Sequence, residues 1–281
     1  MNRQYRGIQQ KIRGVATSDG AGVRLTRVIG SQAMPMLDPF LMLDEFGSEK
    51  PGDYIGGFPS HPHRGFETVT YMLDGRMRHK DNHGNEGLLT PGSVQWMSAG
   101  RGIVHSEMPE QEQGLMRGFQ LWVNLPASEK MNDPKYQEFN AEEIPVHGLP
   151  GGSQVKVIAG QMGDVVGPVK QPATDPLYFD ISLIAGQVFE HAIPAAHNAF
   201  IYVYEGSMNL LVDDQKHLVK ASELISLTKG DSVRFEANEN TRLIFVAGKP
   251  IREPVARYGP FVMNTEAEIH QAIADFQAGK F

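Results

Sequence analysis

The 281-residue chain carries a formal net charge of −7, with 41% hydrophobic and 21% charged residues. This composition indicates a folded core, and the acidic balance argues against a surface that neutralises nucleic-acid phosphates. Because cysteine is absent, disulfides, thiolate metal sites and cysteine nucleophiles are excluded, and any metal must be held by nitrogen and oxygen. The first residues lack a signal-peptide core and no run of about 18 apolar residues occurs, so we expect a soluble, cytoplasmic protein.

Short alternating segments bounded by glycine and proline dominate the sequence, and they predict an all-β sandwich or barrel. Some of them form a repeat. Phe66–Gly75 is followed by a polar hairpin and then by Pro91–Gly100, and His197–Gly206 is followed in the same way by Lys229–Asn238. Both copies have strands separated by an acidic residue–Gly turn and a second Gly turn. Two related antiparallel β-barrels in tandem are the simplest interpretation.

A stretch rich in proline, glycine and charged residues separates the two copies, and it indicates a connector between domains. We expect an N-terminal barrel over residues 1–135, a connector over 136–152 and a second barrel over 153–250. A C-terminal segment over 251–281 follows.

The C-terminal segment has the clearest helical pattern in the chain. Thr265 and Glu268 form a capping box at the start of the predicted helix. Ile269, Ile273 and Phe276 recur at helical spacing and form one apolar stripe. The stripe is expected to pack on a barrel, with binding to a partner protein as the alternative.

Two short segments each combine ligand-type side chains at alternate positions. Residues i and i+2 of a strand share a face, so His61 and His63 project together, as do His105 and Glu107. If the two segments are neighbours in one barrel, three imidazoles and one carboxylate converge on a single point. Burying these groups unpaired is costly, and coordination to a cation removes that cost. The pattern therefore favours a metal site over ordinary core histidines.

The remaining histidines are expected to be structural or exposed. His79 and His83 lie near a predicted hairpin tip and are expected to be solvated. The others have no partner at ligand spacing: His147, His191, His197, His217 and His270.

The motif residues resemble a known family. The segments "HPHRGFETVTYMLDG", "GSVQWMSAGRGIVHSEMP" and "YGPFVMNTEAEIHQAIADFQAGKF" are similar to the pirin family of the cupin superfamily, and the likeness covers essentially the whole chain. The resemblance implies a bicupin, with two tandem antiparallel β-barrels of jelly-roll type and a short C-terminal α-helix. It also implies that the C-terminal segment returns toward the first barrel.

The resemblance further implies one divalent metal ion in the N-terminal barrel, usually Fe²⁺. Its ligands match His61, His63, His105 and Glu107. Such a donor set also suits Mn, Ni, Cu or Zn. The general cupin pattern takes its carboxylate from the first motif, where Glu67 stands, so Glu67 is the rival of Glu107.

The second copy of the repeat carries different residues at the ligand positions. Aligning the two copies places Ala192 and Pro194 where the first copy has His61 and His63. We therefore predict a second barrel without metal, with a packing or lid role.

Pirin-like proteins are associated with quercetin 2,3-dioxygenase activity, so the resemblance implies a metal-dependent oxidoreductase that cleaves a flavonol with dioxygen. Glu107 would act as the catalytic base. Candidates for an apolar wall around a flat aromatic substrate are Phe58, Met97 and Phe119, together with Trp96. Arg64 or Arg101 could orient an anionic substrate.

The alternative function is a metal- or redox-sensing regulator that binds transcription factors or metabolic enzymes through protein contacts. A third is an oxygenase or isomerase of another substrate, because fold and site alone do not choose a substrate. No direct nucleic-acid or membrane partner is expected. Two barrels that face each other would cover their open sides, which favours a monomer.

Overall fold

The computed structural model describes residues 3–281, and they group into two compact units. Residues 15–142 and 251–281 form one unit, here called the first barrel. The described residues up to Gly14 and residues 143–250 form the other, here called the second barrel. Strands dominate both units, and in the described part of the chain no helix is long and apolar enough to span a membrane.

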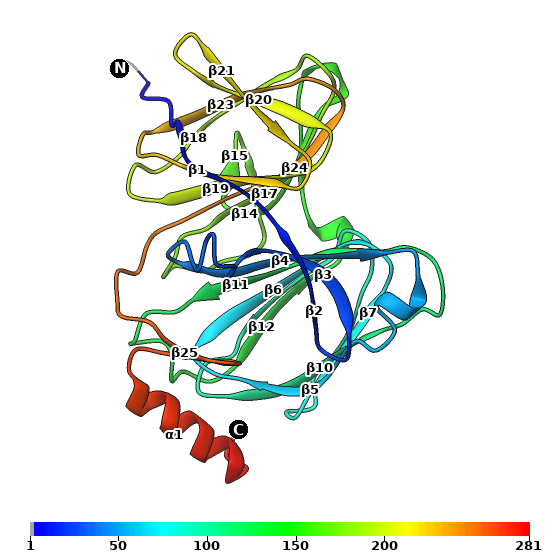
Figure 1. Cartoon of the computed structure of the whole chain (residues 1–281), viewed down its shortest axis with the longest axis vertical. Coiled ribbons are helices and arrows are strands. Elements are labelled where there is room, and N and C mark those ends of the chain that lie inside the picture. Colours follow the sequence, from blue (N-terminus) through cyan, green and yellow to red (C-terminus); the bar gives the residue numbers. More distant parts are fainter. Residues whose placement is uncertain (1–2) are drawn as a thin grey trace. The chain divides into compact units, whose positions relative to one another are not determined.

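The first barrel is built from two antiparallel sheets. Its main strands are β2 (Val15–Asp19), β3 (Val23–Ile29), β4 (Phe40–Ser48), β5 (Phe58–His63), β6 (Phe66–Asp74), β7 (Met77–Asp81), β8 (Glu86–Leu89), β9 (Val94–Ser98), β10 (Ile103–Pro109), β11 (Met116–Asn124) and β12 (Lys135–Phe139). A seven-stranded sheet has the order β12-β9-β6-β11-β4-β3-β2, and a four-stranded sheet has the order β5-β10-β7-β8. Thr70 of β6 donates to Glu107 of β10, so side chains of the two sheets meet in the barrel interior; Figure 1 locates the two strands.

The second barrel has the same two kinds of sheet. Its strands are β1 (Ile8–Arg13), β13 (Val146–Gly148), β14 (Gln154–Ala159), β15 (Gln161–Met162), β16 (Val165–Val166), β17 (Leu177–Leu183), β18 (Val188–Ala192), β19 (Asn198–Glu205), β20 (Ser207–Val212), β21 (Gln215–Lys220), β22 (Glu223–Leu227), β23 (Ser232–Ala237) and β24 (Thr241–Gly248). The seven-stranded sheet has the order β1-β22-β19-β24-β17-β14-β13, and the four-stranded sheet has the order β18-β23-β20-β21. The shared topology confirms the predicted tandem repeat.

Pairing at the edges of the seven-stranded sheets shows which barrel each outermost strand is part of. β12 pairs with β9 in the first barrel, and β1 fills the equivalent edge position in the second barrel by pairing with β22. The N-terminal strand therefore lies in the second barrel, whereas the sequence analysis assigned residues 1–135 to the first. An open sheet edge accepts any suitable strand, and the local sequence of that strand does not say which edge it will join.

The C-terminal segment packs within the first barrel unit. It contains β25 (Ala256–Tyr258), β26 (Phe261–Met263) and α1 (Glu266–Gln277), and α1 lies beside β25 in Figure 1. The predicted capping box of Thr265 and Glu268 is confirmed, because each side chain accepts from the backbone of the other. Ile269 and Ala272 are buried against Phe261, so the apolar face of the helix packs on its own segment.

A buried lysine fastens this segment to the turn that follows β5. Lys130 is 1% exposed, and its Nζ donates to the Gly65 carbonyl at 2.6 Å, to Asn124 Oδ1 at 2.6 Å and to the Val262 carbonyl at 3.0 Å. Gly65 adopts a φ of +85°, and a Cβ there would lie 2.1 Å from the Val262 oxygen. The turn therefore requires glycine and fixes the end of β5.

Replacing Lys130 with a side chain of similar length tests whether its hydrogen bonds stabilise the first barrel. Lys130→Met should lower the free energy of unfolding by about 3 kcal/mol, because three buried acceptors lose their donor. Both tryptophans lie in the first barrel, at positions 96 and 122, so urea unfolding followed by tryptophan fluorescence reports on that unit. Lys50→Met, at an exposed position, is the matched control. Equal stability of the two variants would contradict this role for Lys130.

Candidate metal centre

Pairing of β5 with β10 brings the two sequence motifs together. His105 lies opposite His61, and Glu107 lies opposite Phe58. Between these pairs one residue of β10, Ser106, faces two residues of β5, Pro59 and Ser60, which places a β-bulge next to His61. Pro59 falls in the bulge, and its carbonyl oxygen lies 2.8 Å from His61 Nδ1.

Three imidazole rings meet on the inner side of these strands. Ring centroids are 4.6 Å apart for His61 and His63, 4.5 Å for His61 and His105, and 5.0 Å for His63 and His105. One nitrogen from each ring lies within 4.8 Å of the other two. His63 and His105 are buried and His61 is half-buried. The structure therefore brings the three predicted histidines to one point.

The hydrogen bonds of the rings show which nitrogen of His61 can bind a metal. A carbonyl oxygen can only accept, so His61 Nδ1 donates to Pro59 and Nε2 is the acceptor of the 2.9 Å hydrogen bond with His63 Nε2, whose proton a bound ion would displace. Burial holds the pKa of His63 and of His105 well below the usual value, and the neighbouring imidazoles lower both further. Neutral imidazole is the form that binds a metal ion.

His105 gives the clearest sign that the cluster fits a cation. The ring is 1% exposed, and neither of its nitrogens has a hydrogen-bond partner among the described residues. Unpaired polar atoms in a protein interior cost free energy, and a coordinated ion would reduce that cost by satisfying one of the two nitrogens. Three neutral nitrogen donors suit a divalent first-row metal.

Glu107 lies next to the cluster but is held by other side chains. Its Oε1 is 2.9 Å from the Thr70 hydroxyl and its Oε2 is 3.3 Å from Gln120 Nε2. Thr70 and Gln120 pair across β6 and β11, and all three side chains face the barrel interior. The group of converging donor atoms comprises the three histidines and does not include the Glu107 carboxylate. The carboxylate is thus positioned beside the imidazoles by two neutral donors.

The rival carboxylate of the sequence analysis points elsewhere. Glu67 is an odd number of residues from Thr70 on β6, so it faces the opposite side of the sheet. There its carboxylate accepts a hydrogen bond from Ser98, which lies across the strand pair. The alternation of the strand therefore separates Glu67 from the histidine cluster.

Strand register also corrects the alignment of the two barrels. Val233 lies opposite His191 in the second barrel, as His105 lies opposite His61 in the first. The structural equivalent of His61 is therefore His191, one residue before the Ala192 that the sequence alignment indicated. Two residues separate His63 from Phe66, whereas three separate the equivalent Ile193 from His197, and an ungapped alignment does not take this extra loop residue into account.

The interior of the second barrel is apolar at the equivalent positions. The pairing of neighbouring strands puts Phe235 at the place of Glu107 and Phe245 at the place of Gln120. His191 contacts phenylalanine rings there and offers a single ligand atom. This is the physical basis for the prediction that the second barrel holds no metal.

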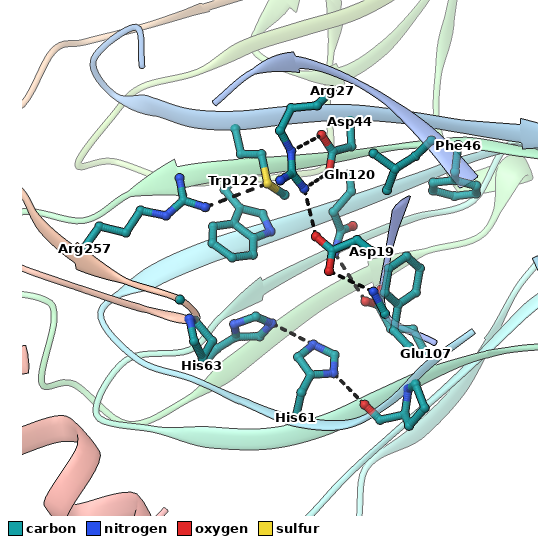
Figure 2. A pocket seen from close by; sticks show the side chains of 17 residues that line it. Asp19, Arg27, Asp44, Phe46, His61, His63, Glu107, Gln120, Trp122 and Arg257 are labelled. Carbon is teal, nitrogen blue, oxygen red and sulfur yellow. Dashed lines mark hydrogen bonds and ion pairs between the residues drawn. The ribbon is translucent and has the colours of Figure 1, made fainter. Parts of the chain in front are cut away.

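A pocket of about 520 Å³ opens beside the histidine cluster (Figure 2). His61, His63 and Glu107 line it together with aromatic side chains that include Phe46 and Trp122. The Trp122 ring contacts the His63 ring at 5.3 Å between centroids. The pocket thus has flat apolar walls and a polar floor, which is the composition of a site for a small aromatic molecule.

Only one of the predicted pocket residues lines this cavity. Phe58 does so. Phe119 precedes the inward-facing Gln120 by one residue and therefore lies on the other face of the sheet, and Trp96 lies there for the same reason. Met97 faces inward but is buried in a cluster with Ala99 and Ile103 away from the pocket. The predictions for Phe119, Trp96 and Met97 are therefore wrong for this pocket.

The environment of His79 also differs from the prediction. It was expected to be solvated at a hairpin tip, but β7 extends to Asp81 and His79 is 3% exposed. Its Nε2 lies 2.6 Å from Glu138 Oε2, and its ring stacks on Tyr136. Strand alternation turns His79 inward, and β12 supplies both partners.

The two arginines suggested as substrate anchors are already paired. Arg64 is 4% exposed and binds Asp275 at 2.9 Å. Arg101 binds Asp133 at 2.7 Å. Neither lines the pocket, so both brace turns.

Comparison with known proteins places the chain in a family. The family models described as Pirin and Pirin C-terminal cupin domain match residues 22–123 and 178–281. A pirin-like protein of Caulobacter vibrioides is 55% identical over 277 residues, which cover 98% of this chain and 99% of that protein. The chain belongs to the pirin family.

Other pirins and a solved structure support the same assignment. Human pirin is 45% identical over 266 residues, covering 94% of this chain and 89% of that protein. A crystal structure of quercetin 2,3-dioxygenase from Acinetobacter baumannii matches with a TM-score of 0.90 and 35% identity, covering 99% of this chain and 98% of that one. The predicted all-β fold with two cupin-type domains is confirmed.

The unpaired nitrogens of His105 give a stability prediction. In the presence of a chelator, His105→Leu should be at least as stable as the wild type, because the substitution removes buried polar atoms that have no partner. Zn²⁺ at about 100 times its Kd should stabilise the wild type by about 2.7 kcal/mol and His105→Leu far less. Urea unfolding with chelator and with Zn²⁺ measures both effects.

His191→Leu is the matched control, since it removes the histidine of the second barrel that corresponds to His61 of the cluster. It should keep the full response to Zn²⁺. A His105→Leu variant that responds as strongly as the wild type would show that the cluster is not the binding site.

Proposed function

We propose that this chain is a metal-dependent dioxygenase that cleaves flavonols such as quercetin at the 2,3 position, with Fe²⁺ as its metal. The observation that carries the proposal is the convergence of three imidazoles beside an aromatic pocket. The quercetin 2,3-dioxygenase at 35% identity supports the choice of reaction. The substrates would be a small aromatic molecule and dioxygen.

His61, His63 and His105 would hold the ion, and Glu107 would complete the set as an exchangeable oxygen ligand. A bound divalent ion supplies a Lewis acid that lowers the pKa of a substrate hydroxyl, and iron adds redox chemistry with dioxygen.

Glu107 would take the proton of the flavonol hydroxyl. A general base must lie within hydrogen-bond reach of the proton it removes, and Glu107 lines the pocket next to the imidazoles. Thr70 and Gln120 hold the carboxylate by one oxygen each, so its direction is set before substrate arrives. These two neutral residues would serve as positioning residues.

The aromatic walls would orient the substrate. Trp122 lies against His63, and Phe46 and Phe58 also line the pocket. Flat rings stacked in such a slot keep water from the reacting carbons and hold the hydroxyl toward the cluster. This arrangement favours a planar fused-ring substrate over a flexible aliphatic one.

The direct test is turnover by the iron-loaded protein. Quercetin loss should be matched by carbon monoxide release and dioxygen uptake in equal amounts, and His61→Ala should abolish both. His191→Leu should keep the wild-type rate. Metal bound to the three histidines without flavonol consumption would overturn the dioxygenase proposal and favour the regulatory alternative.

Glu107→Gln separates proton transfer from metal binding. The variant should keep the three imidazoles and bind metal, while kcat for quercetin falls by about 100-fold or more, the usual effect of losing a general base. Metal content by mass spectrometry and single-turnover rates measure the two properties. An unchanged rate would contradict the role of Glu107 as the base.

A further inference from the structure

One arginine in the pocket lacks a charged partner. Arg257 belongs to β25 of the C-terminal segment, and its guanidinium lies 4.8 Å from the centre of the Trp122 ring. Its nearest recorded polar contacts are long, at 3.4 Å to the Leu41 carbonyl and 4.0 Å to Met42 Sδ. Within the described residues no carboxylate lies within ion-pair distance of it. Most of its five donors are therefore available.

The carboxylates near Arg257 are occupied by a different arginine. Arg27 binds Asp44 through two contacts of 2.9 and 2.7 Å, and it binds Asp19 at 2.8 Å. All three side chains line the same pocket (Figure 2). Because Arg27 makes these contacts with both carboxylates, the hydrogen-bond donors of Arg257 are left for something that enters the pocket.

The position of Arg257 relative to the histidines suggests what kind of molecule would bind in the pocket. Trp122 contacts both the His63 ring, at 5.3 Å, and the Arg257 guanidinium, at 4.8 Å. Figure 2 shows the indole between them. A flat molecule lying along Trp122 would therefore present one end to the imidazoles and the other end to the arginine.

We propose that Arg257 is a specificity-determining residue that binds an anionic group, a carboxylate or a phenolate, on a planar aromatic substrate. The oxygen that reacts would lie at the histidine cluster, and the anion would lie about two fused rings away. This rests on the proposed function and narrows its substrate class to aromatic acids and polyphenols with a second acidic group. A planar guanidinium suits this role, because it pairs with two oxygens while stacking on an aromatic face.

The local electrostatics agree with this role. Partial loss of water and the nearby charge of Arg27 lower the pKa of Arg257, while the charges of Asp44 and Asp19 partly offset this by raising it. The guanidinium nevertheless stays protonated at neutral pH. An anion that binds to Arg257 gains a charge-assisted hydrogen bond.

The test compares two probes that differ by one charge. The probes are 6-hydroxy-2-naphthoic acid and its methyl ester, and binding to the Zn²⁺-loaded protein is measured by calorimetry, so no turnover is involved. The acid should bind the wild type at least about tenfold more tightly than the ester, the effect of one charge-assisted hydrogen bond. Arg257→Gln should abolish this preference and leave ester binding unchanged.

Arg252→Gln is the matched control, because it removes the same charge from an exposed position of the same segment outside the pocket. It should keep the preference for the acid. Equal binding of acid and ester to the wild type, an Arg257→Gln variant that still prefers the acid, or no binding of either probe would overturn the inference. Quercetin turnover is measured separately, so none of these binding results decides whether the protein is a dioxygenase.

Discussion

Three imidazoles buried side by side are the constraint on which the first barrel depends. Two of the rings are almost fully buried, and His105 makes no hydrogen bond through either nitrogen within the described chain. Such an arrangement weakens a fold unless a cation fills it. The surrounding structure holds the three rings in this arrangement. A bulge in β5 lets Pro59 set the tautomer of His61, and Gly65 with Lys130 fixes the strand end beside His63.

Comparison of the two barrels shows how much hydrophobic packing the first barrel gives up to hold the histidine cluster. They share a strand order, yet Glu107 and Gln120 of the first correspond to Phe235 and Phe245 of the second. The second barrel fills its interior with hydrophobic side chains and gains their burial energy. The first gives up part of that energy for a polar floor and an open pocket. The two barrels thus share one topology, but the second has an apolar packed interior and the first has the histidine cluster and the pocket.

The sequence was sufficient for the fold and for the convergence of the histidines, because both follow from strand periodicity. Alternation in β5 and β10 puts His61 with His63 and His105 with Glu107 on one face, whatever the details of packing. The pocket walls could not be predicted in the same way. Phe119 differs from the inward Gln120 by one position, and only the strand register shows which of them faces the cavity. Arg257 had no local signal at all, because it reaches the pocket from a segment more than a hundred residues further along the chain.

The central claim is that one ion sits among the three histidines of the first barrel. Anomalous diffraction from crystals grown after iron loading tests it most directly. The account predicts a single strong peak about 2.1 Å from one nitrogen of each of His61, His63 and His105. Flat density among the three rings, or a peak confined to the second barrel, would contradict it.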